Sequence, residues 1–241
     1  LCTPSLEGVQ ELQETAEQNN CTVLVGYNHT TTPQTTAAEK MLADKAIGDV
    51  ITIDAGFREY WGGIFAAHPW LDGPKDSYLG FWTKGGGATG EHSHAINIWQ
   101  HFAHILGKGR IVKVAAMHDM VQTQDLEYDR LGQLVVETEN GLVGNIVQDV
   151  ITEPAEKKLR IQGNGGSIEW VVNHSSDSDA VLTRDLKGNL SERSFKKSRP
   201  DDFKYEIDHM GDLLENISLE SPISLARGIE TMLVIAAAYQ S

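Results

Sequence analysis

The spacing of hydrophobic positions predicts helices at both ends of the chain and strands between them. Residues 4–19 repeat apolar side chains every three or four positions, and Thr3 followed by Pro4 is a helix-start signal. Residues 21–27 (CTVLVGY) are short, apolar and rich in β-branched side chains, which is typical of a buried strand. We therefore expect the chain to open with a helix and a strand, as at the end of a doubly wound parallel sheet.

The rest of the chain alternates helical and strand patterns around one long irregular segment, residues 58–87. Helical spacing covers residues 32–48 and 89–106, and strand alternation covers residues 49–57. Short β-rich stretches follow at residues 110–117, 132–138, 142–150, 159–162, 167–172, 180–183 and 190–195. Two of them flank Asn140-Gly141, a strong hairpin signal. Two helices close the chain, at residues 203–217 and 225–240.

This order of elements predicts an α+β fold with a large, mostly antiparallel open sheet of six or seven strands and helices on one face. The other face of such a sheet needs a partner. We place four apolar side chains on that outer face, namely Val135, Val143, Ile146 and Val150. We expect the face to be buried in a homodimer or homotetramer.

Charge and composition narrow the classes of partner. The 241 residues include 20 Lys and Arg against 34 Asp and Glu, which gives a formal net charge of −14. A generic phosphate-backbone binder needs a basic surface, so we expect no nucleic-acid partner and no contact with an anionic membrane. Cys2 and Cys21 lack metal or redox spacing, and no apolar run reaches the about 20 residues that span a bilayer, so we expect a reducing, cytoplasmic compartment.

A glycine-rich stretch stands before the residues that bear chemistry. Residues 85–90 (GGGATG) fit the Gly-x-Gly-x-x-Gly pattern of dinucleotide-binding loops, but no buried apolar strand precedes them. We therefore interpret these residues as a glycine turn that lets a helix approach the sheet closely, in preference to a phosphate-binding site. The acidic residues 124–130 (QDLEYDR) are interpreted as the start of a solvent-exposed strand.

Polar residues at helical spacing follow the glycines and form one stripe, Glu91, His94, Asn97 and His101. An imidazole with a carboxylate one turn away suits general acid/base catalysis, because histidine titrates near neutral pH and the carboxylate can orient it. A hydrated or packed histidine cluster is the structural alternative. A metal site is the third: it would combine His92 and His94 with Glu91 or Asp119, although residues two apart on a helix point in different directions.

Several motifs occur in a recognisable order: residues 26–33 (GYNHTTTP), the triple glycine, Glu91 and His94 with Asn97 three positions on, and residues 237–241 (AAYQS). This order resembles the glucose-fructose oxidoreductase and inositol dehydrogenase family of NAD(P)-dependent sugar oxidoreductases, over nearly the whole chain. Three features depart from the family. Its lysine is replaced by Thr3 or deleted, its motif arginine is Thr30, and the acid-to-histidine spacing is three instead of four.

The resemblance implies a division of the chain. Residues 1–30 would be the last helix and strand of a dinucleotide-binding (Rossmann-type) domain, and residues 31–241 a substrate-binding and oligomerisation domain. The glycine fingerprint of the first domain does not occur after Leu1, so we expect the chain to belong to a longer protein and to be inactive alone.

The resemblance also implies an activity. The complete enzyme would transfer a hydride between NAD or NADP and a hydroxyl-bearing carbon of a sugar or cyclitol. His94 would exchange the hydroxyl proton and titrate near about pH 6–7, and Glu91 or Asn97 would orient its ring. The implied substrate contacts are His92, Asn97, Arg58, Tyr60, Trp82 and Lys84, the implied cofactor contacts are Thr3, Pro4 and Tyr27, and no metal ligand is assigned. Two alternatives stay open: a non-redox sugar-binding or assembly module, and a metal-dependent lyase that uses His92 and His94.

Overall fold

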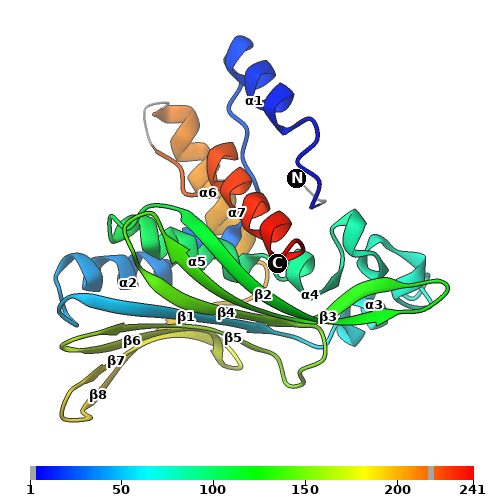
Figure 1. Ribbon diagram of the computed structural model, residues 1–241. Coiled ribbons are helices and arrows are strands. Elements are labelled where there is room, and N and C mark those ends of the chain that lie inside the picture. Colours follow the sequence, from blue (N-terminus) through cyan, green and yellow to red (C-terminus); the bar gives the residue numbers. More distant parts are fainter. Residues whose placement is uncertain (1–3, 217–219) are drawn as a thin grey trace.

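The computed structural model describes residues 4–216 and 220–241, in which eight strands form one open sheet with α2, α5 and α7 on one face (Figure 1). The strands are β1 (Val50–Arg58), β2 (Ile111–Gln122), β3 (Glu127–Thr138), β4 (Val143–Asp149), β5 (Glu156–Gly163), β6 (Gly166–Ser175), β7 (Ser178–Asp185) and β8 (Leu190–Lys196). Their order is β2-β3-β4-β1-β5-β6-β7-β8, and only β1 and β4 pair in parallel. The predicted α+β fold is confirmed, with more strands than expected.

The described helices are α1 (Val9–Gln18), α2 (Pro33–Ala43), α3 (Gly62–Ala67), α4 (Gly87–Glu91), α5 (His94–Ile105), α6 (Asp201–Glu215) and α7 (Leu225–Ala238). Four 3-10 turns join them, η1 (Asn28–Thr31), η2 (Pro74–Asp76), η3 (Tyr78–Gly80) and η4 (Trp82–Lys84). In the part of the chain that the structure describes, every helix is too short or too polar to cross a lipid bilayer.

The core lies between α5 and the middle of the sheet. Trp99 of α5 is fully buried, and its indole Nε1 donates a hydrogen bond of 2.8 Å to the carbonyl oxygen of Ile53 in β1. Gly144 of β4 lies opposite, where a Cβ atom would come within 2.0 Å of that same oxygen and 3.0 Å of the Trp99 ring. A glycine at the centre of the sheet therefore lets α5 pack close to the strands, which fixes the start of α5 next to the candidate site.

The opening of the chain differs from the prediction. The first helix begins at Val9 instead of residue 4, because Gly8 before it adopts a left-handed conformation with φ of 74°. The helix-start signal at Thr3 lies outside the described residues. Residues 21–27 join no sheet: the segment makes one bridge, between Leu24 and Ser224, and only Tyr27 in it is buried. Its apolar, β-branched composition misled the prediction because the described partner is a short segment before α7, not a neighbouring strand.

The helix predicted over residues 89–106 is divided in two. The helix α4 ends at Glu91 and α5 begins at His94, so His92 and Ser93 form a break between them. Gly90 packs against the backbone of Gly85, where a Cβ atom would lie 2.2 Å from the carbonyl oxygen. This tight glycine turn makes α4 a short helix separate from α5, so the predicted polar stripe does not continue along one helix.

The glycine turn itself has the predicted structural role. Gly87 has φ of 75°, and a Cβ atom on it would lie 2.0 Å from Oδ1 of Asp129 in β3. Asp129 is fully buried and accepts hydrogen bonds from the backbone N–H and the hydroxyl of Thr89, at 2.9 and 2.7 Å. The interpretation of residues 124–130 as solvent-exposed is thus wrong for Asp129, which ties α4 to the sheet.

The uncovered face of the sheet carries part of the predicted apolar set. Val135 and Val143 are exposed on it, whereas Ile146 and Val150 are fully buried. The prediction for these two is wrong because alternation along β4 turns residue 146 toward the helices together with Gly144, and Val150 lies beyond the strand and packs with Trp61.

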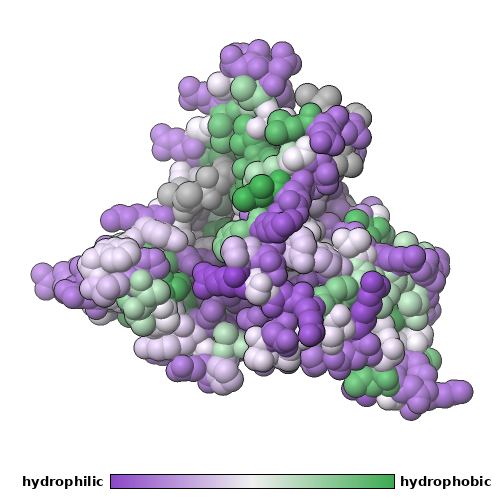
Figure 2. Space-filling model, turned by 180° about the vertical axis from the view of Figure 1, so that it is seen from behind, coloured by the Kyte–Doolittle hydropathy of each residue, from purple (hydrophilic) through white to green (hydrophobic). Residues whose placement is uncertain are grey.

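Exposed apolar side chains also occur above the sheet. Seen from behind, hydrophobic residues gather in the upper, helical part of the molecule (Figure 2). On α6, Phe203, Ile207 and Leu214 are exposed at spacings that place them on one face of the helix. The helix α1 also exposes an apolar side chain, Leu12. The helical part thus presents an apolar surface that the described residues leave uncovered.

Candidate functional site

A cavity of about 670 Å³ brings together six of the residues singled out in the sequence. They are Pro4, Tyr27, Trp82, Lys84, Glu91 and His94. The cavity lies where the segment before η1, the turns η3 and η4, the break between α4 and α5, and α7 meet. Segments distant in the sequence therefore build one pocket around the start of α5.

His94 lies in this cavity between two aromatic rings. Its imidazole is edge-on to Tyr27 at 5.3 Å between ring centroids and to His29 at 5.1 Å, and its Nδ1 is buried without a hydrogen-bond partner. Burial, followed by the positive charge of Lys157 and by His92, lowers the pKa of His94 to about 3. The expectation that His94 titrates near neutral pH is therefore wrong, because a ring with so low a pKa is neutral at physiological pH.

Glu91 faces the same cavity but is held by a different partner. The Tyr78 hydroxyl donates a hydrogen bond of 2.9 Å to Oε2 of Glu91. Burial raises the pKa of Glu91, and the hydrogen bond from Tyr78 and the charge of Lys157 oppose this effect. The break after Glu91 places it and His94 on separate helices, so the carboxylate is oriented by the aromatic loop. Tyr78 is a cavity residue that the sequence analysis did not single out.

Aromatic rings form one wall of the cavity. The Trp82 ring lies 4.7 Å from Tyr239, and His118 stacks on Tyr239 at 4.7 Å with an interplanar angle of 12°. The Tyr239 hydroxyl donates a hydrogen bond of 2.6 Å to the buried Asp129. The wall is therefore fixed from behind. The closing motif AAYQS was the available signal for Tyr239, whereas no pattern in the sequence pointed to Asp129.

A cation stands at the rim of the cavity. Lys84 is exposed, and its Nζ lies 4.1 Å from the centroid of the Phe81 ring. Together with Glu91 and His94 it gives the pocket a donor, a carboxylate and a neutral imidazole, which is a set suited to a small polyhydroxylated ligand.

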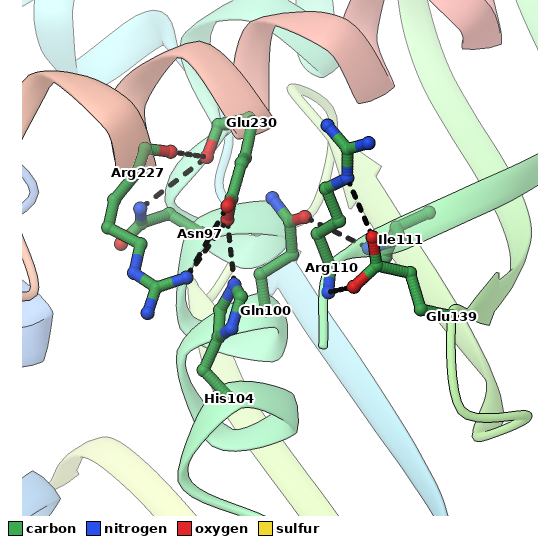
Figure 3. A network of polar contacts seen from close by, with 9 residues as sticks. Asn97, Gln100, His104, Arg110, Ile111, Glu139, Arg227 and Glu230 are labelled. Atoms are coloured by element: carbon green, nitrogen blue, oxygen red, sulfur yellow. Dashed lines mark hydrogen bonds and ion pairs between the residues drawn. The ribbon is translucent and has the colours of Figure 1, made fainter. Parts of the chain in front are cut away.

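The remaining members of the predicted stripe do not reach this cavity. The Asn97 amide donates to Thr231 of α7 at 3.4 Å, and His101 is hydrogen-bonded to Glu39 of α2 at 2.6 Å. His104 pairs with Glu230 at 2.7 Å, and Figure 3 shows this contact beside Asn97 in the network that joins α5, α7 and the start of β2. The contacts of Asn97 and His101 therefore agree with the structural alternative, a packed polar cluster, because both side chains join α5 to neighbouring helices.

Three other predicted substrate contacts also lie outside the cavity lining. Arg58 forms an ion pair with Asp149 at 3.0 Å, and Tyr60 is exposed, with its backbone N–H bonded to Thr152. His92 is buried and does not line the cavity, and its Nε2 has no hydrogen-bond partner. The predicted cofactor contact at Thr3 falls outside the described residues.

The metal-site alternative lacks a ligand set. Within residues 4–216 and 220–241 no group of three or more His, Cys, Asp or Glu side chains is placed to hold a metal ion. Asp119, the distant ligand considered from the sequence, instead forms an ion pair with Arg130 at 2.7 Å.

Comparison with known proteins adds one family and a set of similar folds. The sequence model described as "GFO/IDH/MocA C-terminal domain" matches residues 35–169. An NAD-binding oxidoreductase from Klebsiella pneumoniae is similar in structure, with a TM-score of 0.74 and 17% identity over 99% of this chain and 69% of that one. Levoglucosan dehydrogenase in complex with NADH and levoglucosan is also similar, with a TM-score of 0.75 and 18% identity over 99% of this chain and 68% of that one. An inositol dehydrogenase homolog with NAD⁺ from Azotobacter vinelandii has a TM-score of 0.72 and 16% identity over 98% of this chain and 68% of that one. No curated protein matches the chain in a sequence comparison.

Proposed function

The chain belongs to the GFO/IDH/MocA family, whose C-terminal domain model matches more than half of it, and from this premise we propose that it is the substrate-binding part of an NAD(P)-dependent oxidoreductase. Its substrate would be a sugar, sugar derivative or cyclitol, oxidised at a hydroxyl-bearing carbon. The observation that carries the proposal is the convergence of His94, Glu91 and Lys84 in one cavity with an aromatic wall. The sugar and cyclitol dehydrogenases among the similar folds support the same substrate class.

Different residues of the cavity would contact different parts of such a substrate. The aromatic wall formed by Trp82 and Tyr239 would contact the apolar side of a sugar or cyclitol, and Lys84 and Glu91 would contact its hydroxyl groups. His94 is neutral, so its ring can accept the proton of the hydroxyl that is oxidised. Burial destabilises the resulting imidazolium, so we expect His94 to release the proton again after the substrate has been oxidised.

The nicotinamide cofactor fits the described residues only at its reactive end. A nicotinamide bound at this cavity would take up the hydride from the substrate carbon, as in other enzymes that use it. Pro4 and Tyr27 line the cavity and are the proposed contacts for that end. The triple glycine does not fit a pyrophosphate, because the space beside Gly87 that a phosphate group would need is filled by the Asp129 carboxylate. We therefore assign phosphate binding to a separate dinucleotide-binding domain.

That domain would adjoin the apolar helical surface. We assign residues 1–30 to its end and residues 31–241 to the substrate-binding domain. In Figure 1 α1 stands clear of the sheet, and the exposed apolar side chains of α1 and α6 surround this region. An uncovered apolar surface of this kind is expected to bury itself against another domain. The chain alone is therefore expected to bind substrate without turning it over.

The test joins a dinucleotide-binding domain of the family ahead of Leu1 and follows NADH or NADPH formation with a panel of sugars and cyclitols. With a substrate that turns over, His94→Ala should lower kcat by about 10²- to 10⁴-fold, the usual value of a positioned proton-transfer group. His101→Ala is the matched control, because its ring is bonded to Glu39 outside the cavity, and it should cost much less. Ligand binding without turnover in every variant would support the non-redox sugar-binding alternative instead.

A further inference from the structure

The buried carboxylate of Asp129 bonds to two segments that meet at the cavity. Its Oδ2 accepts hydrogen bonds from the backbone N–H and the hydroxyl of Thr89 in α4, at 2.9 and 2.7 Å. Its Oδ1 accepts a hydrogen bond of 2.6 Å from the hydroxyl of Tyr239. Asp129 is fully buried in β3 and does not line the cavity, whereas Tyr239 does. Asp129 can therefore act on a ligand only through the residues that it holds.

The two oxygens of this carboxylate hold different elements. Burial of a carboxylate costs free energy, and the donors that compensate it here are neutral groups of Thr89 and Tyr239. The bonds to Thr89 use only Oδ2, so fixing α4 to the sheet does not need the second oxygen. The bond at Oδ1 holds a side chain that directly follows α7. Asp129 thus has a contact with the cavity wall in addition to its contact with α4.

The hydrogen bond fixes the polar end of the Tyr239 ring. The ring also contacts Trp82 and His118, each at 4.7 Å between centroids. Contacts between rings allow a range of orientations, whereas a short hydrogen bond places the hydroxyl at one point. His118 does not supply such a bond, because its Nε2 is buried without a hydrogen-bond partner. The orientation of Tyr239, and with it the ring contact to Trp82, therefore depends on Asp129.

We propose that Asp129 is a positioning residue for substrate binding: by holding the Tyr239 hydroxyl it sets the place of the aromatic wall, Tyr239 with Trp82, against which a sugar or cyclitol ring packs. Both rings line the cavity, together with Glu91 and His94. This proposal rests on the proposed function, in which the wall contacts the apolar side of the substrate. It adds a residue outside the cavity that determines how tightly the substrate is bound.

The consequence is a separation of binding from proton transfer. The proposed function assigns proton transfer to His94, whose ring contacts Tyr27 and His29. The hydrogen bond between Asp129 and Tyr239 involves none of these three rings. Its loss should weaken the contact with the substrate in the ground state and in the transition state alike, which raises KM and leaves kcat nearly unchanged. A purely structural role would instead lower the amount of active enzyme at an unchanged KM.

The first test observes the wall without a substrate, by fluorine NMR of the chain labelled with fluorotryptophan. The Trp82 signal is assigned with Trp82→Phe. Tyr239→Phe removes the hydrogen bond and Asp129→Asn leaves one acceptor oxygen in place of two, so each should shift or broaden the Trp82 signal while that of the core residue Trp99 stays in place. Gln148→Met is the matched control: it removes buried hydrogen bonds to the backbone of α4 and none to Tyr239, and it should leave the Trp82 signal unchanged.

The second test measures kinetics in the enzyme that carries a dinucleotide-binding domain, with a sugar or cyclitol that it turns over. Asp129→Asn and Tyr239→Phe should each raise KM by about tenfold, the fold-change that corresponds to the loss of one aromatic contact. The same variants should change kcat by less than about threefold, because His94 keeps its surroundings.

Three results would overturn the proposal. They are an unchanged Trp82 signal in both folded variants, an equal change of that signal in Gln148→Met, and a fall in kcat at unchanged KM. If Asp129→Asn does not fold, Tyr239→Phe removes the same hydrogen bond and decides the question. Absence of turnover in every enzyme, the wild type included, contradicts the proposed function, whereas the Trp82 signal is measured without a substrate and still decides whether Asp129 sets the wall.

Discussion

Acidification should destabilise this chain through its buried histidines. Burial and the charge of Lys157 lower the pKa of His94 to about 3 and that of His92 to about 4, and they lower that of His29 in the same direction. In the unfolded chain a histidine titrates near about 6.5. A base whose pKa is depressed by folding contributes stability that is present above its unfolded pKa and is lost as the pH falls through its folded pKa. The window for His92 and His94 therefore runs from about pH 6.5 down to about 4 and 3.

The expected loss is large between pH 7 and pH 5. At pH 5 the unfolded imidazoles are almost fully protonated, whereas His92 and His94 in the folded chain are still neutral, which costs about 2 kcal/mol for each ring relative to pH 7. The two rings together contribute about 4 kcal/mol, and His29 adds to it. Small domains are stable by about 5–15 kcal/mol, so this loss is a large share of the total.

Urea unfolding followed by circular dichroism at pH 7 and pH 5 measures the effect. Burial raises the pKa values of Glu91 and Asp129, which stabilise the fold as the pH falls, so the comparison must be made between variants. The double variant His92→Gln/His94→Gln should lose about 4 kcal/mol less than the wild type on going to pH 5. Trp99→Phe is the matched control, since it loses a buried hydrogen bond without losing a titrating group. Equal losses in the wild type and the double variant would refute the reasoning.

Three further predictions concern the cofactor, the assembly and the glycine turn. The described chain should bind NAD(H) or NADP(H) no more tightly than about millimolar by calorimetry, because Asp129 stands behind the glycines, and micromolar affinity would reinstate them as a phosphate site. Light scattering should detect a dimer or tetramer that Val135→Asp weakens, since Val135 and Val143 are exposed on the open sheet face; a monomer at tens of micromolar contradicts this interface. Gly87→Ala should lower stability by about 2 kcal/mol or more in urea, because the added Cβ meets the Asp129 carboxylate, whereas Gly188→Ala, also at positive φ but with open space around it, should cost less.

The sheet could be predicted because its signals are local. Alternation along residues 49–57 and 132–138 and the Asn140-Gly141 turn each depend on a few neighbouring residues, and the structure places strands and a hairpin there. The errors occur where a distant partner decides. Residues 21–27 look like a strand but pair only at Leu24, and Ile146 looks like an outer-face residue until the register of β4 is known. Periodicity gives the period of a side-chain pattern but not which face is covered.

The cavity could be predicted in part for the same reason. Glu91 and His94 were found because they are close in sequence to the triple glycine, Tyr27 because it occurs in a short motif, and Trp82 because of its position in the long irregular segment, residues 58–87. Asp129 was missed, because its acidic neighbours in residues 124–130 suggest an exposed segment. Only its contact with Gly87 and Thr89, which are about forty positions away, shows why a carboxylate is buried there.

The chemistry of His94 depends on features that no spacing in the sequence contains. The helical pattern predicted a carboxylate one turn from the imidazole, but the break at His92 and Ser93 turns Glu91 to Tyr78 and leaves His94 among aromatic rings. The shift of the His94 pKa has desolvation as its largest cause, and desolvation is set by everything that packs around the ring. A residue type and its spacing can therefore nominate a proton acceptor, but the protonation state in which it acts is a property of the folded pocket.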